Sequence, residues 1–252
     1  MESLILNGNV LMNIILVSKE EVGQDQSILL EGRRFEHIKN VLKPAVGDFL
    51  RVGIIGEDRY QAELVDISNS QCNLRLVDRL QPFSEPSLDL ILALPRPKCM
   101  KRLWAQLSAV GFKRIFIVNA EKVEKVYWGS TTLLEEVYKP LLLEGLEQCG
   151  DTILPEVRFV KRLRPFLEDE VPTLFANQQK VIAHPYNSGV EEAILADVAS
   201  VNSRKVIAVG PEGGWNDFEI SLFAKAGFKS FSLGERILRT DTAVIALAAL
   251  LK

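Results

Sequence analysis

The chain has 252 residues, of which 47% are apolar and 25% are charged, a composition typical of a soluble globular protein and not of a disordered or collagen-like chain. Its length predicts one large domain or two smaller ones. Thirty basic residues against thirty-three acidic ones give a net charge of −3, so a surface that binds nucleic acid would have to be local.

Cysteine and histidine usage argue against several kinds of site. Cys72, Cys99 and Cys149 are far apart and lack CxxC spacing, which is typical of a reducing compartment and predicts a cytoplasmic location. The two histidines, His37 and His184, are too few for a multi-histidine metal site. We therefore expect no metal centre.

The apolar stretches do not predict a membrane protein. The first basic residue, Lys19, follows the N-terminal apolar stretch instead of preceding it, so a secretory signal is not expected. The longest apolar run, residues 243–251, is about half of the ~20 residues that cross a bilayer. We expect this run to form a buried helix.

Short alternating runs separated by turn signals fill the first third of the chain, at residues 49–55, 59–68 and 71–80. This pattern predicts an antiparallel meander or a small barrel. One helix is expected before it, because four apolar residues share a helical face that ends at Pro44. These residues are Phe35, Ile38, Val41 and Leu42.

A change of pattern marks a domain boundary at residues 81–87, which contain two prolines and two serines. We therefore predict two domains, at residues 1–82 and 86–252. From Leu88 onward, the runs LDLILAL, RIFIV, VRFV, KVIAH, KVIAV and KSFSL alternate with longer segments of helical period. Such alternation predicts βαβ units and a mainly parallel sheet, with ligands bound beyond the carboxyl ends of its strands.

A basic cluster lies between residues 90 and 120, where there is no acidic residue. It contains Arg96, Lys98, Lys101, Arg102, Lys113 and Arg114. On a loop and the start of a helix, these side chains could hold phosphates. The alternative is a solvated helix face balanced by Glu121 and Glu124.

The strand-like run VIAV is followed by GPEGG at residues 210–214, hereafter the glycine loop. Glycines permit positive φ and a close approach of the backbone to a ligand. Asn216 and Glu219 have the spacing of a capping box, which predicts a helix directly after the loop. Strand, glycine loop and helix N-terminus together favour a site for a nucleotide or another polar ligand, and a purely structural tight turn is the alternative.

A second loop follows the run KSFSL, where Gly234 and ERILRT precede an apolar helix that begins at Thr240. A basic residue at a helix N-terminus opposes the helix dipole. We therefore expect Arg239 to have an anionic partner, which is either a ligand or the side chain of Asp241 or Glu212.

GxSxG, GxGxxG and GxxxxGK[ST] are all missing from the sequence, which removes the main support for a hydrolase, a Rossmann dehydrogenase or a P-loop protein. GPEGG followed by LGERILRTDTA resembles instead the signature of the RsmE-type small-subunit ribosomal RNA uridine-N3 methyltransferases. HIKNVLK, EQCGDTILPE and IAHP resemble further motifs of that family in the same order.

The resemblance implies an α/β SPOUT domain at residues 86–252, with a mainly parallel sheet and a C-terminal trefoil knot. A small PUA-like β-barrel that binds RNA would precede it at residues 1–82. The implied cofactor is S-adenosyl-L-methionine, and the implied partners are ribosomal RNA or the small ribosomal subunit and a second copy of the chain.

The resemblance also implies site residues. The cofactor would contact His184, Pro185, Gly210, Pro211, Glu212, Gly213, Gly214, Leu233, Gly234, Ile237, Leu238 and Thr240. Methylation at uridine N3 requires loss of the imide proton and places negative charge on the uracil carbonyls. We assign stabilisation of this charge to Arg239. Glu212 or Asp241 would orient the Arg239 side chain or relay the proton. RNA would contact Arg33, Arg34, Lys43, Arg96, Lys98, Lys101, Arg102 and Arg236.

Departures from the family pattern keep two alternatives open. Gln106, Ala109 and Asp151 stand where we expect a Lys, a Glu and a basic residue. The chain could therefore be a SPOUT methyltransferase that acts on a different RNA, or a non-catalytic RNA-binding dimer of the same fold. Of the three tryptophans, Trp215 directly follows the glycine loop and is the one to test for base stacking.

Overall fold

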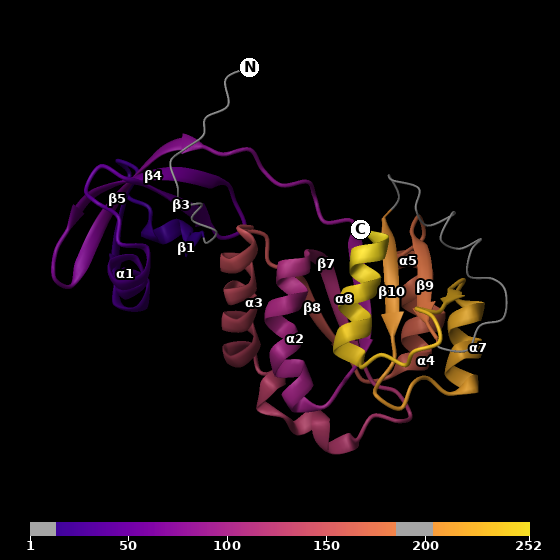
Figure 1. Ribbon diagram of the computed structural model, residues 1–252. Helices are drawn as coiled ribbons and strands as arrows, with labels where there is room; N and C mark the ends of the chain where they lie inside the picture. The colour runs from indigo at the N-terminus through magenta and orange to yellow at the C-terminus, as the bar shows by residue number, and fades with distance from the viewer. Residues whose placement is uncertain (1–13, 185–203) are drawn as a thin grey trace. The chain divides into compact units, whose positions relative to one another are not determined.

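A computed structural model describes residues 14–184 and 204–252 and divides the chain into two compact units (Figure 1). The first unit contains the residues up to 84 together with Leu143–Leu154, and the second contains Glu85–Leu142 and Pro155–Lys252. Within the described ranges, no helix has the length and apolar character that a bilayer crossing requires.

The first unit is built on a five-stranded sheet in the order β1-β3-β4-β5-β2. Its elements are β1 (Ile15–Val17), η1 (Lys19–Glu21), β2 (Ser27–Glu31), α1 (Gly32–His37), η2 (Ile38–Leu42), β3 (Phe49–Ile54), β4 (Arg59–Ile67) and β5 (Gln71–Arg79). Strands β3, β4 and β5 form the predicted antiparallel meander, and β1 lies parallel to β3.

The predicted helical face is found only in part. Phe35 and Ile38 are buried in the core of the first unit, but Val41 is 64% exposed. The reason is a change of helix type, because the chain passes from α1 into the π-helical turn η2 at Ile38. A wider turn does not keep the 3.6-residue period, so the prediction for Val41 was wrong.

A later segment of the chain, Leu143–Leu154, completes the first unit. Leu146, near the end of α3 (Glu135–Cys149), is buried in a cluster with Ile14 and Leu16. The backbone N–H of Ile14 donates to the carbonyl of Glu147 at 3.1 Å, and Arg33 pairs with the Glu147 carboxylate at 3.0 Å. Residues 143–154 therefore pack with residues of the first unit that precede them by more than a hundred positions in the sequence, such as Arg33, 114 positions before Glu147.

The second unit contains a six-stranded sheet in the order β11-β9-β10-β6-β7-β8. Every neighbouring pair is parallel, which confirms the predicted parallel sheet. The strands are β6 (Leu88–Ala93), β7 (Phe112–Val118), β8 (Glu156–Val160), β9 (Gln179–Ala183), β10 (Lys205–Val209) and β11 (Lys229–Phe231). The helical segments are α2 (Pro97–Val110), η3 (Lys125–Gly129), η4 (Thr131–Leu133), α4 (Leu163–Pro165), η5 (Phe166–Glu170), α5 (Val171–Leu174), α7 (Asp217–Lys225) and α8 (Thr240–Leu251).

Helices pack on the sheet of this unit (Figure 1), and α8 contacts both α2 and β10. The apolar C-terminal run forms α8, and Val244 and Leu247 are buried, but Leu250 is 51% exposed. The expectation of a fully buried helix is thus corrected, because only one side of α8 packs against α2 and β10.

Two residues of the predicted basic cluster have structural partners at the amino ends of the strands. Asp89 in β6 is fully buried, and Arg114 binds its carboxylate through two hydrogen bonds of 2.9 and 2.6 Å. Lys113 pairs with Glu85. The buried Asp89 carboxylate requires such compensation, so Arg114 belongs to the fold. Both cations lie at the edge opposite to the strand ends where ligands are expected.

Candidate functional site

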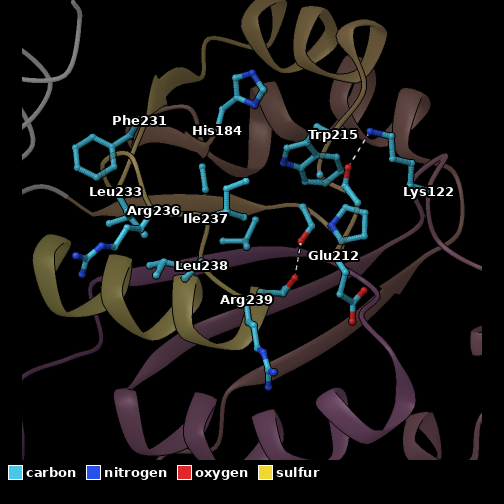
Figure 2. Close-up of a pocket in the computed structure, with 18 of the residues that line it drawn as sticks. Lys122, His184, Glu212, Trp215, Phe231, Leu233, Arg236, Ile237, Leu238 and Arg239 are labelled. Atoms are coloured by element: carbon cyan, nitrogen blue, oxygen red, sulfur yellow. Dashed lines mark hydrogen bonds between the residues drawn. The ribbon is translucent and has the colours of Figure 1, made fainter. Parts of the chain in front are cut away.

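A pocket of about 440 Å³ lies at the carboxyl ends of β9, β10 and β11 (Figure 2). Its walls are the glycine loop after β10 and the loop between β11 and α8. The described lining residues are Lys122, Ala183, His184, Val209, Gly210, Pro211, Glu212, Gly213, Gly214, Trp215, Phe231, Leu233, Gly234, Arg236, Ile237, Leu238, Arg239, Thr240 and Ala243. The volume is within the range typical of small-molecule sites.

The glycine loop is tightly folded between β10 and α7. Gly214 has φ of +69°, a conformation that side chains disfavour, and its N–H donates to the Pro211 carbonyl at 2.8 Å. The predicted capping box is confirmed. Asn216 Oδ1 accepts from the Glu219 N–H at 2.8 Å, and the Glu219 carboxylate accepts from the Asn216 N–H at 2.9 Å.

Three bonds attach this segment to the loops that follow β6 and β7. The Glu212 carboxylate accepts from the backbone N–H of Arg96 at 3.0 Å. Lys122 Nζ donates to the carbonyl of Gly213 at 2.8 Å (Figure 2). Glu219 is buried and also accepts from the N–H of Glu121 at 2.8 Å.

Sequence reasoning missed Lys122 as a lining residue of the pocket. Lys122 and Gly213 are 91 positions apart, and no spacing pattern connects them. Only the place of Lys122 just beyond β7, at the sheet edge where ligands bind, could have suggested it.

The second loop is joined to the glycine loop by Thr240, whose hydroxyl donates to the Gly210 carbonyl at 3.4 Å. Gly234 has φ of +99°, which allows the sharp turn after β11. Ile237 is 76% exposed, and Figure 2 shows it between Leu238 and the strand ends. Exposed apolar side chains that line a pocket favour contact with an apolar ligand surface.

His184 follows β9 at the edge of the pocket, where its backbone N–H donates to the Phe231 carbonyl at 2.9 Å. Burial lowers the pKa of its imidazole from the ordinary value of 6.5, although Asp217 acts in the opposite direction. Partial burial therefore favours the neutral form of the ring. Pro185, the other residue predicted here, lies outside the described residues.

The residues predicted to be catalytic are only partly brought together. Arg239 and Glu212 line the pocket, whereas Asp241 is absent from the described lining. Asp241 pairs with Arg102 at 2.8 Å, and Glu212 is bonded to the backbone of Arg96. Among the described residues neither carboxylate pairs with Arg239, so the predicted intramolecular ion pair is not found.

The predicted RNA-binding residues fall into two groups. Arg96, Lys98, Lys101 and Arg102 are exposed at the start of α2, and Arg236 is exposed on the pocket wall. In the first unit Lys43 is exposed, Arg33 pairs with Glu147, and Arg34 is bonded to Glu21 and to the Leu16 carbonyl. The hydrogen bond from Arg34 lowers the pKa of Glu21.

Comparison with known proteins identifies the family. A family model described as RNA methyltransferase domain matches residues 83–252. Ribosomal RNA small subunit methyltransferase E of Treponema pallidum is 31% identical over 94% of this chain and 90% of its own length. The chain belongs to the small-subunit ribosomal RNA methyltransferase E family.

Further members of the family are similar over nearly their whole length. Ribosomal RNA small subunit methyltransferase E 1 of Borreliella burgdorferi is 27% identical over 93% of this chain and 95% of its own. The fold agrees with a crystal structure of the methyltransferase E from Neisseria gonorrhoeae bound to S-adenosyl methionine. That structure has a TM-score of 0.75 and 23% identity, covering 94% of this chain and 95% of the other.

Proposed function

We propose that this protein transfers a methyl group from S-adenosyl-L-methionine to N3 of a uridine in small-subunit ribosomal RNA. The observation that carries the proposal is the pocket between the glycine loop and the loop before α8, in a chain that belongs to this family.

The residues of the pocket fit this cofactor. The side chains of Leu233, Ile237 and Leu238 offer an apolar surface to the adenine ring, and the peptide groups of Gly210–Gly214 can bond its polar edges. A bound sulfonium supplies an activated methyl group. The cofactor contacts therefore involve His184, Pro185, Gly210, Pro211, Glu212, Gly213, Gly214, Leu233, Gly234, Ile237, Leu238 and Thr240.

Three side chains would act on the uridine. The guanidinium of Arg239 stabilises the negative charge that develops on the uracil carbonyls, as a fixed donor does in an oxyanion hole. Glu212 is held by one oxygen through the Arg96 N–H, and its second oxygen orients Arg239 or accepts the imide proton. Asp241, held by Arg102, is the alternative proton acceptor.

Contacts to RNA extend from the pocket. The exposed cations at the start of α2 lie next to the glycine loop, since Arg96 bonds Glu212, and these side chains would bind phosphates while the base enters the pocket. The proposed RNA-binding residues are Arg33, Arg34, Lys43, Arg96, Lys98, Lys101, Arg102 and Arg236.

The proposal includes the larger architecture of the family. The first unit, with its meander β3–β4–β5, would be a PUA-like barrel that binds RNA, and the second a SPOUT domain. The bond from Thr240 to Gly210 is compatible with a C-terminal segment threaded as a trefoil knot. The exposed apolar side of α8, including Leu250, supports a homodimer. Ribosomal RNA as the substrate places the protein in the cytoplasm.

The experiment is a methyl-transfer assay with labelled cofactor on purified small ribosomal subunits and on free RNA, followed by mapping of the methylated base. Replacement Arg239→Ala should lower kcat about 100-fold without changing the cofactor affinity. Replacement Ala243→Phe should abolish cofactor binding by filling the pocket, whereas Ala224→Phe, at an exposed position of α7 outside the pocket lining, should not.

Each outcome decides between functions. A labelled uridine N3 supports the proposal, and a label on another base or another RNA favours the related methyltransferase with a different target. Absence of cofactor binding by the folded wild type, also with RNA present, contradicts an enzymatic function and favours a non-catalytic RNA-binding protein.

A further inference from the structure

We infer that Lys122 is a positioning residue that holds the glycine loop in the conformation that binds the cofactor. The inference rests on the proposed function of the pocket. It assigns a role to a side chain from the β7–η3 loop, far in sequence from both loops that form the pocket walls.

The contact itself is specific. Lys122 Nζ donates to the carbonyl of Gly213 at 2.8 Å, and Lys122 lines the pocket on the side of Trp215 (Figure 2). Gly213 is the fourth residue of the glycine loop, and one described hydrogen bond within the loop runs from the Gly214 N–H to the Pro211 carbonyl. The turn holds this peptide group through the Gly214 N–H, and the Lys122 ammonium bonds its other end, the Gly213 carbonyl.

The absence of a side chain at position 213 is explained by the same lysine. A Cβ atom built on Gly213 would lie 2.9 Å from Cδ and 3.3 Å from Cβ of Lys122, and its three nearest neighbours are all atoms of this side chain. Unlike Gly214, Gly213 has no positive φ, so its backbone does not require glycine. The aliphatic stem of Lys122 approaches the loop this closely because residue 213 has no side chain.

The backbone of the lysine is anchored as well. The preceding residue, Glu121, donates its N–H to the buried Glu219 at 2.8 Å, and Glu219 is the N3 residue of the capping box of α7. The following residue, Val123, is buried. The backbone around Lys122 is therefore held in place. A donor on a rigid backbone can hold the glycine loop in one position through its bond to Gly213.

Lysine 122 is assigned a positioning role and not a catalytic one, because its described bond is to protein backbone. Loss of the ammonium should weaken the cofactor complex by loosening the loop and should leave the transfer step unchanged once the cofactor is bound. This separates it from Arg239, for which a change of kcat is expected.

The test uses the full chain and isothermal titration with S-adenosyl-L-methionine. Lys122→Met keeps the stem and removes the donor, and it should weaken affinity about threefold to tenfold, as expected for one hydrogen bond from a charged group at an exposed site. Lys122→Arg should restore most of the affinity. Lys125→Met, an exposed lysine three residues on, is the matched control and should bind as the wild type does.

A double-mutant cycle gives a second, independent readout. Gly213→Ala should weaken cofactor binding in the wild type, and Lys122→Ala should remove most of that effect, because the Cβ would no longer meet the lysine stem. Coupling between contacting residues is the expected sign of such a pair. In methyl transfer, Lys122→Met should raise KM for the cofactor and leave kcat within twofold.

Two results would overturn the inference. One is unchanged cofactor affinity of Lys122→Met together with additive effects in the cycle. The other is a variant that binds the cofactor normally but has lost affinity for RNA, which would make Lys122 an RNA contact. Failure of the wild type itself to bind the cofactor would instead refute the proposed function, and with it this inference.

Discussion

At the scale of single residues, Gly210 and Trp215 form a close contact in the pocket wall. A Cβ atom on Gly210 would lie 3.2 Å from the Trp215 backbone nitrogen and 3.2 Å from its indole. The indole cannot retreat, since Trp215 is 4% exposed and packs on Phe223 with ring centroids 4.8 Å apart.

The replacement Gly210→Ala should therefore shift the glycine loop. Overpacking costs about 1–3 kcal/mol, so we expect a loss of cofactor affinity of about tenfold, measured by titration calorimetry. Gly129→Ala is the control, because a Cβ at Gly129 meets no atom within 4 Å. If Gly210→Ala, Gly129→Ala and the wild type bound the cofactor with equal affinity, this would contradict the proposal that the glycine loop forms a wall of the cofactor pocket.

His184 gives a pH dependence with a defined sign. Because burial lowers its pKa below 6.5, the unfolded chain binds more protons than the native one as the pH falls through 6.5, and this costs stability. Above that range the imidazole is neutral in both states and contributes nothing. The wild type should thus lose more stability between pH 7.5 and 5.5 than His184→Gln does, measured by urea unfolding. Parallel pH profiles would argue against a half-buried imidazole with a lowered pKa.

At the scale of elements, the start of α7 was predicted correctly from a local sequence pattern. Its capping box was predicted from the spacing of Asn216 and Glu219, and both bonds are present. The pattern is reliable because it concerns residues three positions apart, and their geometry is set by the first turn of the helix. The face of α1 was less predictable, because the π-helical turn at Ile38 changes the period.

The replacement Asn216→Ala should lower the free energy of unfolding by about 1 kcal/mol, the usual value for a lost N-cap. Urea denaturation measures the change. Ser221→Ala in the same helix is the control, since its hydroxyl bonds the Phe218 carbonyl one turn earlier in α7 and such bonds add little. The cap matters for function as well, because it fixes the end of the glycine loop.

At the scale of the whole molecule, the first unit is not continuous in sequence. Residues 143–154 supply Leu146 to the cluster around Ile14 and Leu16. In the same segment, the Thr152 carbonyl accepts a hydrogen bond from the N–H of Gly56 at 2.8 Å. A fragment that ends at residue 84 therefore lacks part of its core.

We expect the fragment 1–84 to be poorly folded, since removal of a buried leucine alone costs about 2–5 kcal/mol. Joining residues 143–154 to it through a flexible linker should restore a folded unit. Dispersion of the ¹H–¹⁵N spectrum distinguishes the two states. A well-dispersed spectrum of the shorter fragment would show that residues 143–154 are dispensable for folding.

The sequence by itself determined the features that depend on neighbours along the chain. These are the alternating runs of the meander, the parallel strands, the capping box at Asn216 and the two loops that bound the pocket. Tertiary structure alone decided which distant residues meet, such as Lys122 with Gly213, 91 positions apart, and Arg102 with Asp241, 139 positions apart. Periodicity reports which face of a segment is buried, but it does not encode which partner covers that face.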